Sequence, residues 1–242
     1  NEIYQFFWHE FCDWYLEITK LRVIGAEHGR VNAQAVLLQV FETSLRLMHP
    51  FIPFLTEELW QQLPHQGETV VRAPYPTAAH EWTDQEAEQE MTFVMEVISA
   101  LRNIRSSFKI PNATKLRLHI KAAVDHAKLI QRHHSYIASL ANISEMIIDQ
   151  EMVRPDLSAT AILDEMEIYI PLEGLIDVEV ERTRLTRELK RIQEDVVRLE
   201  AKLAQRDFLE KAPEDVIERE QAKHQGLRER EGKLIQALES IQ

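Results

Sequence analysis

The side chains that could carry out chemistry are few, and none stands in a catalytic arrangement. Cys12 is the only cysteine, so the chain can build neither an internal disulfide nor a cysteine-rich zinc knuckle. The pair His133 and His134 lacks a third ligand at metal spacing, so we expect no zinc there. The sequence has no glycine-rich phosphate loop, no nucleophile beside a base and no paired carboxylates of catalytic type. We therefore expect no catalytic residue, metal or cofactor in this segment.

Basic side chains, by contrast, recur at helical spacing near the C-terminal end. They form two stripes beside an apolar seam, and Asp195 interrupts the first stripe. Their members are Arg184, Arg187, Arg191, Arg198 and Lys202, followed by Arg219, Lys223, Arg230 and Lys233. Positions that flank such a seam usually hold ion pairs between two helices, worth roughly a few tenths of a kcal/mol each. Ion pairing is therefore the first explanation to weigh for these residues.

The seam itself has the most regular period in the chain. Its first half steps by four and three residues, through Leu185, Leu189, Ile192, Val196, Leu199 and Leu203. A helix can bury such a heptad pattern only against another helix. Pro213 suits the first turn of that second helix, whose seam continues through Ile217, Leu227, Leu234, Leu238 and Ile241. We expect an antiparallel coiled-coil hairpin over residues 176–242, with arms about 40 Å long at 1.5 Å per residue.

The first 76 residues have the pattern of a helical bundle. Apolar side chains recur three and four residues apart over 1–28, where Gly25 and Gly29 should end the helix. Further helices are expected over Val31–Met48, broken by Pro50, and from Pro53 to Leu63. Aromatic residues of the first helix sit at core spacing, so we interpret them as core rather than as a base-stacking platform: Phe6, Phe7, Phe11, Trp14 and Tyr15. Phe54 and Trp60 are interpreted as core as well.

The helix and strand patterns over residues 77–175 predict a small α+β connector domain. Thr83 to Glu86 matches a capping box, which opens a helix that runs to about Phe108. The expected order after that helix is a strand at 116–120, a helix over 125–140, a strand at 146–148, and a hairpin of 161–163 with 168–170. The fold class is thus mainly α: a helical bundle (1–76), this connector (77–175) and the coiled-coil hairpin (176–242).

The formal net charge of −12 argues at first against a nucleic-acid partner. Residues 181–242, however, hold 14 basic and 14 acidic residues, so the whole acidic excess lies in the first 180 residues. No apolar run approaches the roughly 18 residues that span a bilayer, and the N-terminus lacks a signal peptide. We expect a cytoplasmic protein without membrane contact. The absence of an initiator methionine suggests a piece of a longer chain.

Four motifs resemble the valyl-tRNA synthetases, a family of class I aminoacyl-tRNA synthetases. Residues 11–17 (FCDWYLE) and 49–60 (HPFIPFLTEELW) resemble the anticodon-binding bundle, and 171–177 (PLEGLID) and 208–213 (FLEKAP) resemble the start and tip of the tRNA-binding arm. The resemblance covers nearly the whole chain. The HIGH and KMSKS signatures that hold ATP and the adenylate are absent, so this segment alone should not aminoacylate. In the parent enzyme, ATP and Mg would serve a catalytic domain.

The resemblance also implies particular contacts with tRNA(Val). Residue-by-residue matching places Leu16 and Glu17 against anticodon bases, while Lys20 could meet a phosphate. The arm lies against the tRNA elbow in this family, where Arg198 and Lys223 are the best candidates, with Arg191 and Lys202 beside them. Arg102, Arg105 and Lys109 could reach the tRNA backbone, although we favour exposure for solubility. Besides tRNA, the expected partners are the catalytic and editing domains of the parent chain, in a monomer.

Two other interpretations stay open from the sequence. The first is the equivalent region of an isoleucyl or leucyl synthetase, although the isoleucyl enzyme usually ends in a zinc module that one cysteine cannot build. The second is a protein-interaction module, in which the acidic first 180 residues and the hairpin bind another polypeptide.

Overall fold

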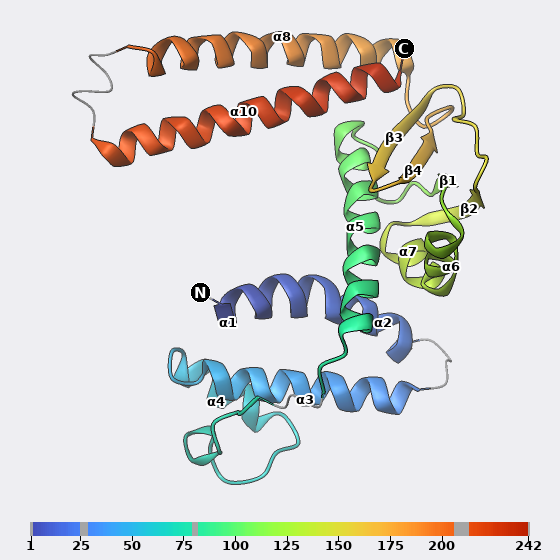
Figure 1. The fold of residues 1–242 in the computed structure, drawn as a ribbon. Helices are drawn as coiled ribbons and strands as arrows, with labels where there is room; N and C mark the ends of the chain where they lie inside the picture. The colour runs from blue at the N-terminus through green and yellow to red at the C-terminus, as the bar shows by residue number, and fades with distance from the viewer. Residues whose placement is uncertain (1, 25–28, 79–81, 206–212, 242) are drawn as a thin grey trace. The chain divides into compact units, whose positions relative to one another are not determined.

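A computed structural model describes residues 2–24, 29–78, 82–205 and 213–241 of the chain (Figure 1). Two compact units divide it, Asn1–Met95 and Glu96–Gln242, and each is considered separately below. The fold is mainly helical with one small mixed sheet, as the sequence predicts. The three-part division at residues 76 and 175 stays a prediction. Two expected features lie outside the described residues, namely the helix end at Gly25 and the arm tip over 208–212.

The first helix of unit 1 contains a π-helical segment that its sequence pattern does not reveal. It comprises α1 (Glu2–Gln5), the π-helix η1 (Phe6–Tyr15) and α2 (Leu16–Ile24). The backbone N–H of Leu16 bonds the carbonyl of Phe11, five residues back, which is the π pattern. Two helices follow, α3 (Arg30–Met48) and α4 (Pro53–Gln61). Gly29 precedes α3 with φ at +107°, a conformation that favours glycine.

The core of unit 1 is centred on Trp60, which is 1% exposed and packs with Leu45 and Val70. Its indole Nε1–H donates to a carboxylate oxygen of Glu42 at 2.8 Å, so the one polar atom of the ring is satisfied. Val70 belongs to a short 3₁₀ helix, η2 (Val70–Arg72). The prediction that Phe54 is also core is wrong, because that side chain is 92% exposed.

A second set of packed aromatic rings lies along the first helix. Phe11 is buried and stacks on Phe7, Tyr15 and Phe41, with ring centroids 5.3, 5.9 and 6.1 Å away. This confirms core packing for the buried row. Phe6 departs from the expectation, since it is exposed on another side of the helix.

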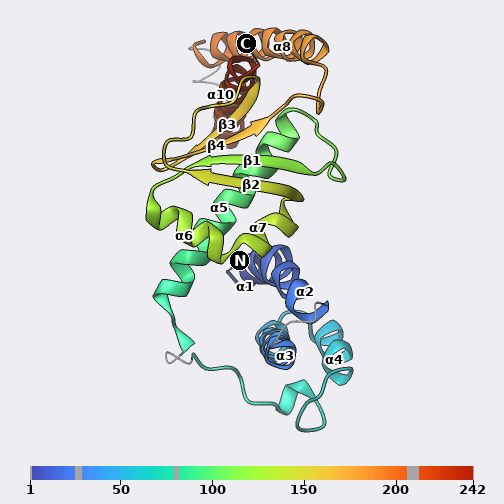
Figure 2. The same cartoon turned by 90° about the vertical axis from the view of Figure 1, so that its right-hand side faces the viewer.

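Unit 2 contains a four-stranded sheet of order β2-β1-β4-β3 (Figure 2). The strands are β1 (Leu116–Lys121), β2 (Ile143–Asp149), β3 (Ser158–Leu163) and β4 (Met166–Pro171). β1 and β2 are parallel, and α6 (Val124–Arg132) and α7 (His134–Leu140) connect them. The other pairs are antiparallel. The single helix expected over 125–140 is therefore two helices, with a break at His133.

One face of the sheet is apolar and fully buried. Leu116, Leu118 and Ile120 of β1 alternate with partly or fully exposed residues, the pattern of a sheet covered on one side. The long helix α5 (Gln85–Ser107) reaches this unit from residue 96 onward and buries Leu101 and Ile104. Its N-terminal cap is Asp84, whose carboxylate accepts from the N–H of Ala87 at 3.0 Å. The expected capping residue, Thr83, is one position too early.

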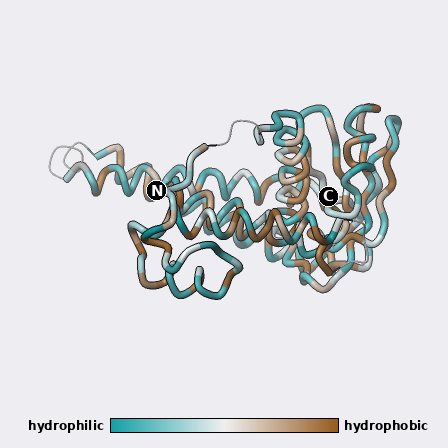
Figure 3. Tube along the Cα trace, turned by 90° about the horizontal axis from the view of Figure 1, so that it is seen from below, coloured by the Kyte–Doolittle hydropathy of each residue, from teal (hydrophilic) through white to brown (hydrophobic). Residues whose placement is uncertain are grey.

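Two long helices, α8 (Val178–Leu203) and α10 (Glu214–Ser240), lie side by side in unit 2 (Figure 1). They are antiparallel, because Arg182 near the start of α8 donates to the carbonyl of Ile241 at the end of α10. Figure 3 shows hydrophilic and hydrophobic residues alternating along the arms. The α8 seam is largely confirmed, since four of its members are buried: Leu185, Ile192, Val196 and Leu199. No described helix is long and apolar enough to cross a membrane.

Candidate nucleic-acid interface

The first candidate surface lies on α2, where the structure brings Leu16, Glu17 and Lys20 onto neighbouring turns. Lys20 pairs with Glu17 at 2.5 Å between Nζ and Oε1, and both side chains stay about half exposed. Leu16 is partly buried, so it offers an apolar edge rather than a full surface. The two charges can separate at little cost, because exposed ion pairs contribute about 0–1 kcal/mol. The Glu17 carboxylate could then accept from a base amine and Lys20 could meet a phosphate.

The second candidate surface is the helix pair of α8 and α10, whose charges are sorted by edge. Arg230 donates to Glu188 across one edge at 2.5 Å, and Arg228 donates to Glu200 across the other at 2.6 Å. These two contacts fix which heptad positions share an edge.

The edge that carries the Arg230–Glu188 contact is called here the cationic edge. Its charged members are Glu181, Arg184, Glu188, Arg191, Asp195, Arg198, Lys202, Arg219, Lys223, Arg230 and Lys233. The described residues of α10 contribute four basic and no acidic side chains to it. Basic residues outnumber acidic ones by eight to three, so this edge attracts anions.

The opposite edge, called here the acidic edge, carries the Arg228–Glu200 contact. Its charged members among the described side chains are Glu179, Lys190, Glu200, Glu218, Arg228 and Glu239. Acidic residues outnumber basic ones by four to two, while Arg187, Glu194, Asp215 and Glu229 lie opposite the seam, on the outward faces of the helices. The helix pair is thus balanced in total charge but strongly two-sided, a property that the net charge of the segment conceals.

The four predicted elbow residues all lie on the cationic edge, but in different environments. Arg198 is 77% exposed and pairs with Asp195 of its own helix at 3.1 Å. Arg191 and Lys223 are exposed. Lys202 is partly buried and donates to Glu220 of the other helix at 2.7 Å. The first three can therefore reach a ligand directly, whereas Lys202 also links the two helices.

Arg184 belongs to the predicted basic stripe but has a structural role. Its guanidinium pairs with Glu181 and Glu188 and donates to the backbone carbonyl of Ser107, at the end of α5, at 2.9 Å. The hydrogen bond with Glu181 is the main cause that raises the pKa of Arg184. This side chain anchors α8 within unit 2 and has little capacity left for a phosphate.

Arg105 corrects another expectation. The sequence favours exposure for this residue, yet its side chain is buried and donates to the carbonyls of Ala141, Asn142 and Pro111 at 2.8, 3.0 and 3.1 Å. Burial lowers the pKa of its guanidinium. Arg105 therefore ties α5 to the loop before β2, while Arg102 and Lys109 are exposed as expected.

Three polar residues of the α10 seam were missed by sequence reasoning. Glu220, His224 and Glu231 complete a strict alternation of three and four steps with the apolar seam residues, and all are partly buried. Glu200 accepts from His224 at 3.0 Å as well as from Arg228. These residues could have been found by extending the three-and-four spacing of the α10 seam to every position, polar or apolar.

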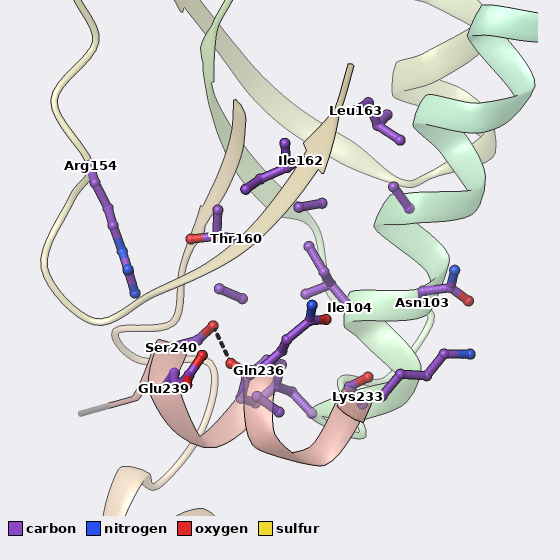
Figure 4. A pocket seen from close by; sticks show the side chains of 16 residues that line it. Asn103, Ile104, Arg154, Thr160, Ile162, Leu163, Lys233, Gln236, Glu239 and Ser240 are labelled. Carbon is purple, nitrogen blue, oxygen red and sulfur yellow. Dashed lines mark hydrogen bonds between the residues drawn. The ribbon is translucent and has the colours of Figure 1, made fainter. Parts of the chain in front are cut away.

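A cavity of about 540 Å³ lies where α5, β3 and the end of α10 meet (Figure 4). Its lining combines small apolar side chains with polar groups such as Asn103, Gln236 and Ser240. The Ser240 hydroxyl donates to the backbone carbonyl of Gln236 at 2.9 Å. Neither this lining nor any other part of the described chain gathers three His, Cys, Asp or Glu residues at metal-binding distance.

Comparison with known proteins supplies the deciding observation. Residues 1–120 match the family model of the anticodon-binding domain of tRNA ligase, and residues 177–242 match that of the valyl tRNA synthetase tRNA binding arm. A valine–tRNA ligase of Thermotoga maritima is 41% identical over 241 residues, which is 99% of this chain and 27% of that protein. A valine–tRNA ligase of Geobacillus stearothermophilus is 39% identical over 225 residues, or 92% of this chain and 26% of that protein.

The chain belongs to the valyl-tRNA synthetase family. It spans about a quarter of the length of the curated relatives that it matches. Membership in this family confirms the sequence-based resemblance, and it disfavours both the isoleucyl or leucyl alternative and the protein-interaction module. The second match begins at residue 177, the N-cap of α8, where Asp177 accepts from the N–H of Val180 at 3.1 Å.

Proposed function

We propose that this chain recognises valine tRNA at two places, the anticodon loop and the elbow. Unit 1 contacts the anticodon loop through Leu16, Glu17 and Lys20. The helix pair acts as a coiled-coil arm and contacts the elbow through Arg198, Lys223, Arg191 and Lys202. The names of the two matching family models, an anticodon-binding domain and a tRNA binding arm, support this assignment.

The two-sided charge of the helix pair is the single observation that carries the proposal. One edge holds eight basic and three acidic residues, whereas the opposite edge holds four acidic and two basic residues, so an anionic ligand is attracted to the first edge alone. An RNA backbone supplies such a ligand, since phosphate contacts dominate the affinity of protein–nucleic acid complexes. Arg191, Arg198 and Lys223 lie along this edge, where a flat elbow base pair and its phosphates would meet them.

Binding at two separate sites would orient the tRNA as well as hold it. Each contact supplies part of the affinity, and together they fix the direction of the acceptor end. In a full-length enzyme the acceptor end would point to a catalytic domain that uses ATP and Mg, with an editing domain beside it. This segment would act in the cytoplasm, within a monomeric enzyme, and would need no cofactor of its own. In this proposal, the division after residues 76 and 175 separates these roles.

Charge reversal on opposite edges of the arm tests the proposal. The test variant combines Arg198→Glu with Lys223→Glu, and the matched control combines Arg187→Glu on the outward face of α8 with Lys190→Glu on the acidic edge. We expect the test variant to bind valine tRNA about tenfold more weakly. The slope of log K against the logarithm of the salt concentration should become shallower by about one to two. The control should change both quantities much less. Equal effects of the two variants, or no preference of the wild-type chain for valine tRNA over a non-cognate tRNA, would show that the proposal is wrong.

A further inference from the structure

Two aromatic rings on the first helix are exposed although the same helix buries a row of aromatic rings. Tyr4 is 59% exposed and Trp8 is 52% exposed, and their rings lie parallel with centroids 6.5 Å apart. The core does not require them, because Phe11 and its neighbours Phe7 and Tyr15 fill the buried side. An exposed pair of stacked rings costs solvation without contributing to the packing of this unit.

The π-helical segment determines what else shares their side of the helix. In an α-helix each step of four residues drifts by about 40° around the axis, since a turn holds 3.6 residues. In the wider turn of a π-helix, closed by bonds five residues apart, the same step drifts the other way. The helix is α up to Gln5, π from Phe6 to Tyr15 and α again from Leu16, so the two drifts offset each other.

The consequence is a nearly straight row of residues spaced four apart. On the buried side, Phe7, Phe11 and Tyr15 follow one another in such a row, with ring centroids 5.3 and 5.9 Å apart. The parallel row on the neighbouring side runs through Tyr4, Trp8, Cys12, Leu16 and Lys20. An uninterrupted α-helix would carry Trp8 away from Leu16, whereas the π segment returns it to the same line.

We propose that Trp8, supported by Tyr4, stacks on an unpaired base of the RNA loop whose neighbouring bases meet Leu16 and Glu17. The inference rests on the proposed anticodon-loop contact of unit 1 and extends it by an aromatic residue. The ligand is an unstacked base in a single-stranded loop, since a base within a duplex has no free face to offer. At the other end of the row, Lys20 provides the charge for a phosphate, and Glu17, which pairs with Lys20, provides the acceptor for a base amine.

The chemistry of the row fits a loop of RNA in preference to a protein surface. Base–aromatic stacking needs an exposed flat ring, which Trp8 provides, and it tolerates any base because every base has a π-face. A purely apolar protein contact would not use Lys20 at one end of the row, nor Glu17, which is ion-paired with it. The π segment is consistent with a binding role, because such segments occur frequently at functional sites.

Three tryptophan variants test the inference, with the anticodon stem-loop of valine tRNA as the titrated ligand. Trp8→Ala should weaken binding about tenfold, the typical loss of one base–aromatic stack, while Trp8→Phe should restore most of the affinity. Trp82→Ala removes another exposed tryptophan, 73% exposed and also in unit 1, and should leave binding unchanged. Tryptophan emission should be quenched by the RNA in the wild type and in the Trp82→Ala variant, but much less in Trp8→Phe.

Variants at the residues assigned to the anticodon under the proposed function distinguish the stacking role of Trp8 from the anticodon contact itself. If Glu17→Ala and Leu16→Ala weaken stem-loop binding but Trp8→Ala does not, the stacking role is wrong and the anticodon contact survives. If none of these variants changes binding, the anticodon contact itself is wrong. Circular dichroism of each variant checks folding, and an affinity of Trp8→Phe as low as that of Trp8→Ala would also contradict stacking, because a phenyl ring preserves the π-face.

Discussion

Arg230 on α10 donates to Glu188 on α8, with 2.5 Å between Nη2 and Oε1, although 42 residues separate them in the chain. This contact and the pair of Lys202 with Glu220 close the same edge of the arm. Apolar burial on α10 is concentrated near its C-terminal end, at Leu234 and Ile241. Away from that end, ion pairs therefore supplement the buried α8 residues Ile192, Val196 and Leu199 in holding the helix pair together.

Acid should therefore loosen the helix pair. The pKa values of Glu188, Glu200 and Glu220 lie below the ordinary value, chiefly because Arg230, Arg228 and Lys202 respectively donate hydrogen bonds to them. A carboxylate with a lowered folded-state pKa contributes stability that is present above its unfolded pKa of about 4.3 and is lost as the pH falls through the folded value. We expect helix content, followed by circular dichroism, to be constant from pH 7 to about 5 and to decrease below about 4.

The matched variant replaces all three carboxylates by glutamine. This triple variant should be less stable than the wild type at pH 7, with a much smaller further loss on acidification. A variant that follows the wild-type acid profile unchanged would show that other carboxylates control the transition.

Loss of Arg105 should destabilise unit 2 strongly. Arg105→Met preserves much of the side-chain volume but removes the donors to three carbonyls. Those of Pro111 and Asn142 keep the backbone N–H groups of Thr114 and Leu116, whereas the buried carbonyl of Ala141 loses its described donor. We expect the free energy of unfolding to fall by about 3 kcal/mol, as for other buried hydrogen-bond networks that lose their charged member. Urea denaturation measures the change, and Arg117→Met on the exposed side of β1 is the control, expected within about 0.5 kcal/mol of wild type. A similarly small effect at Arg105 would contradict the structural role.

Trp60 and Phe54 are six residues apart in one motif, yet their truncation should have very different effects on stability. Trp60→Ala opens the core around Leu45 and should cost about 3–5 kcal/mol of unfolding free energy. Phe54→Ser removes a ring that is almost fully exposed and should cost less than about 0.5 kcal/mol. Thermal unfolding of the two variants compares them directly. A large loss of stability at Phe54 would mean that the ring is packed in solution.

The only cysteine reports on the proposed RNA row. Cys12 lies between Trp8 and Leu16 in that row, and burial, followed by the charge of Asp13, raises the pKa of its thiol. Alkylation should therefore be slow at neutral pH and accelerate as the pH rises, because only the thiolate reacts. Saturating anticodon stem-loop RNA should slow the reaction several-fold, measured by mass spectrometry with free glutathione as the control for reagent loss. Unchanged alkylation with bound RNA would place the RNA elsewhere.

The sequence predicts most of the helices and strands, and the failures have physical causes. The α8 seam is confirmed because burial against one partner helix leaves a strict period. The π segment escapes detection because its apolar residues fit the α pattern nearly as well. Phe54 was expected in the core but is exposed, and Arg105 was expected to be exposed but is buried. Residue type gives only an average tendency to be buried, which local contacts can override. The separation of basic and acidic residues onto two edges of the helix pair does not follow from the sequence alone, because it depends on which residues of α8 and α10 face each other. The Glu188–Arg230 and Glu200–Arg228 contacts determine that pairing.

Footprinting of valine tRNA on the chain tests the central claim most directly, because it reads both contacts in one experiment. We predict protection of the anticodon loop and of the elbow by the wild-type chain. The Arg198→Glu, Lys223→Glu variant should lose the elbow protection and keep that of the loop. Protection at neither place, or the same pattern on a non-cognate tRNA, would contradict two-site recognition.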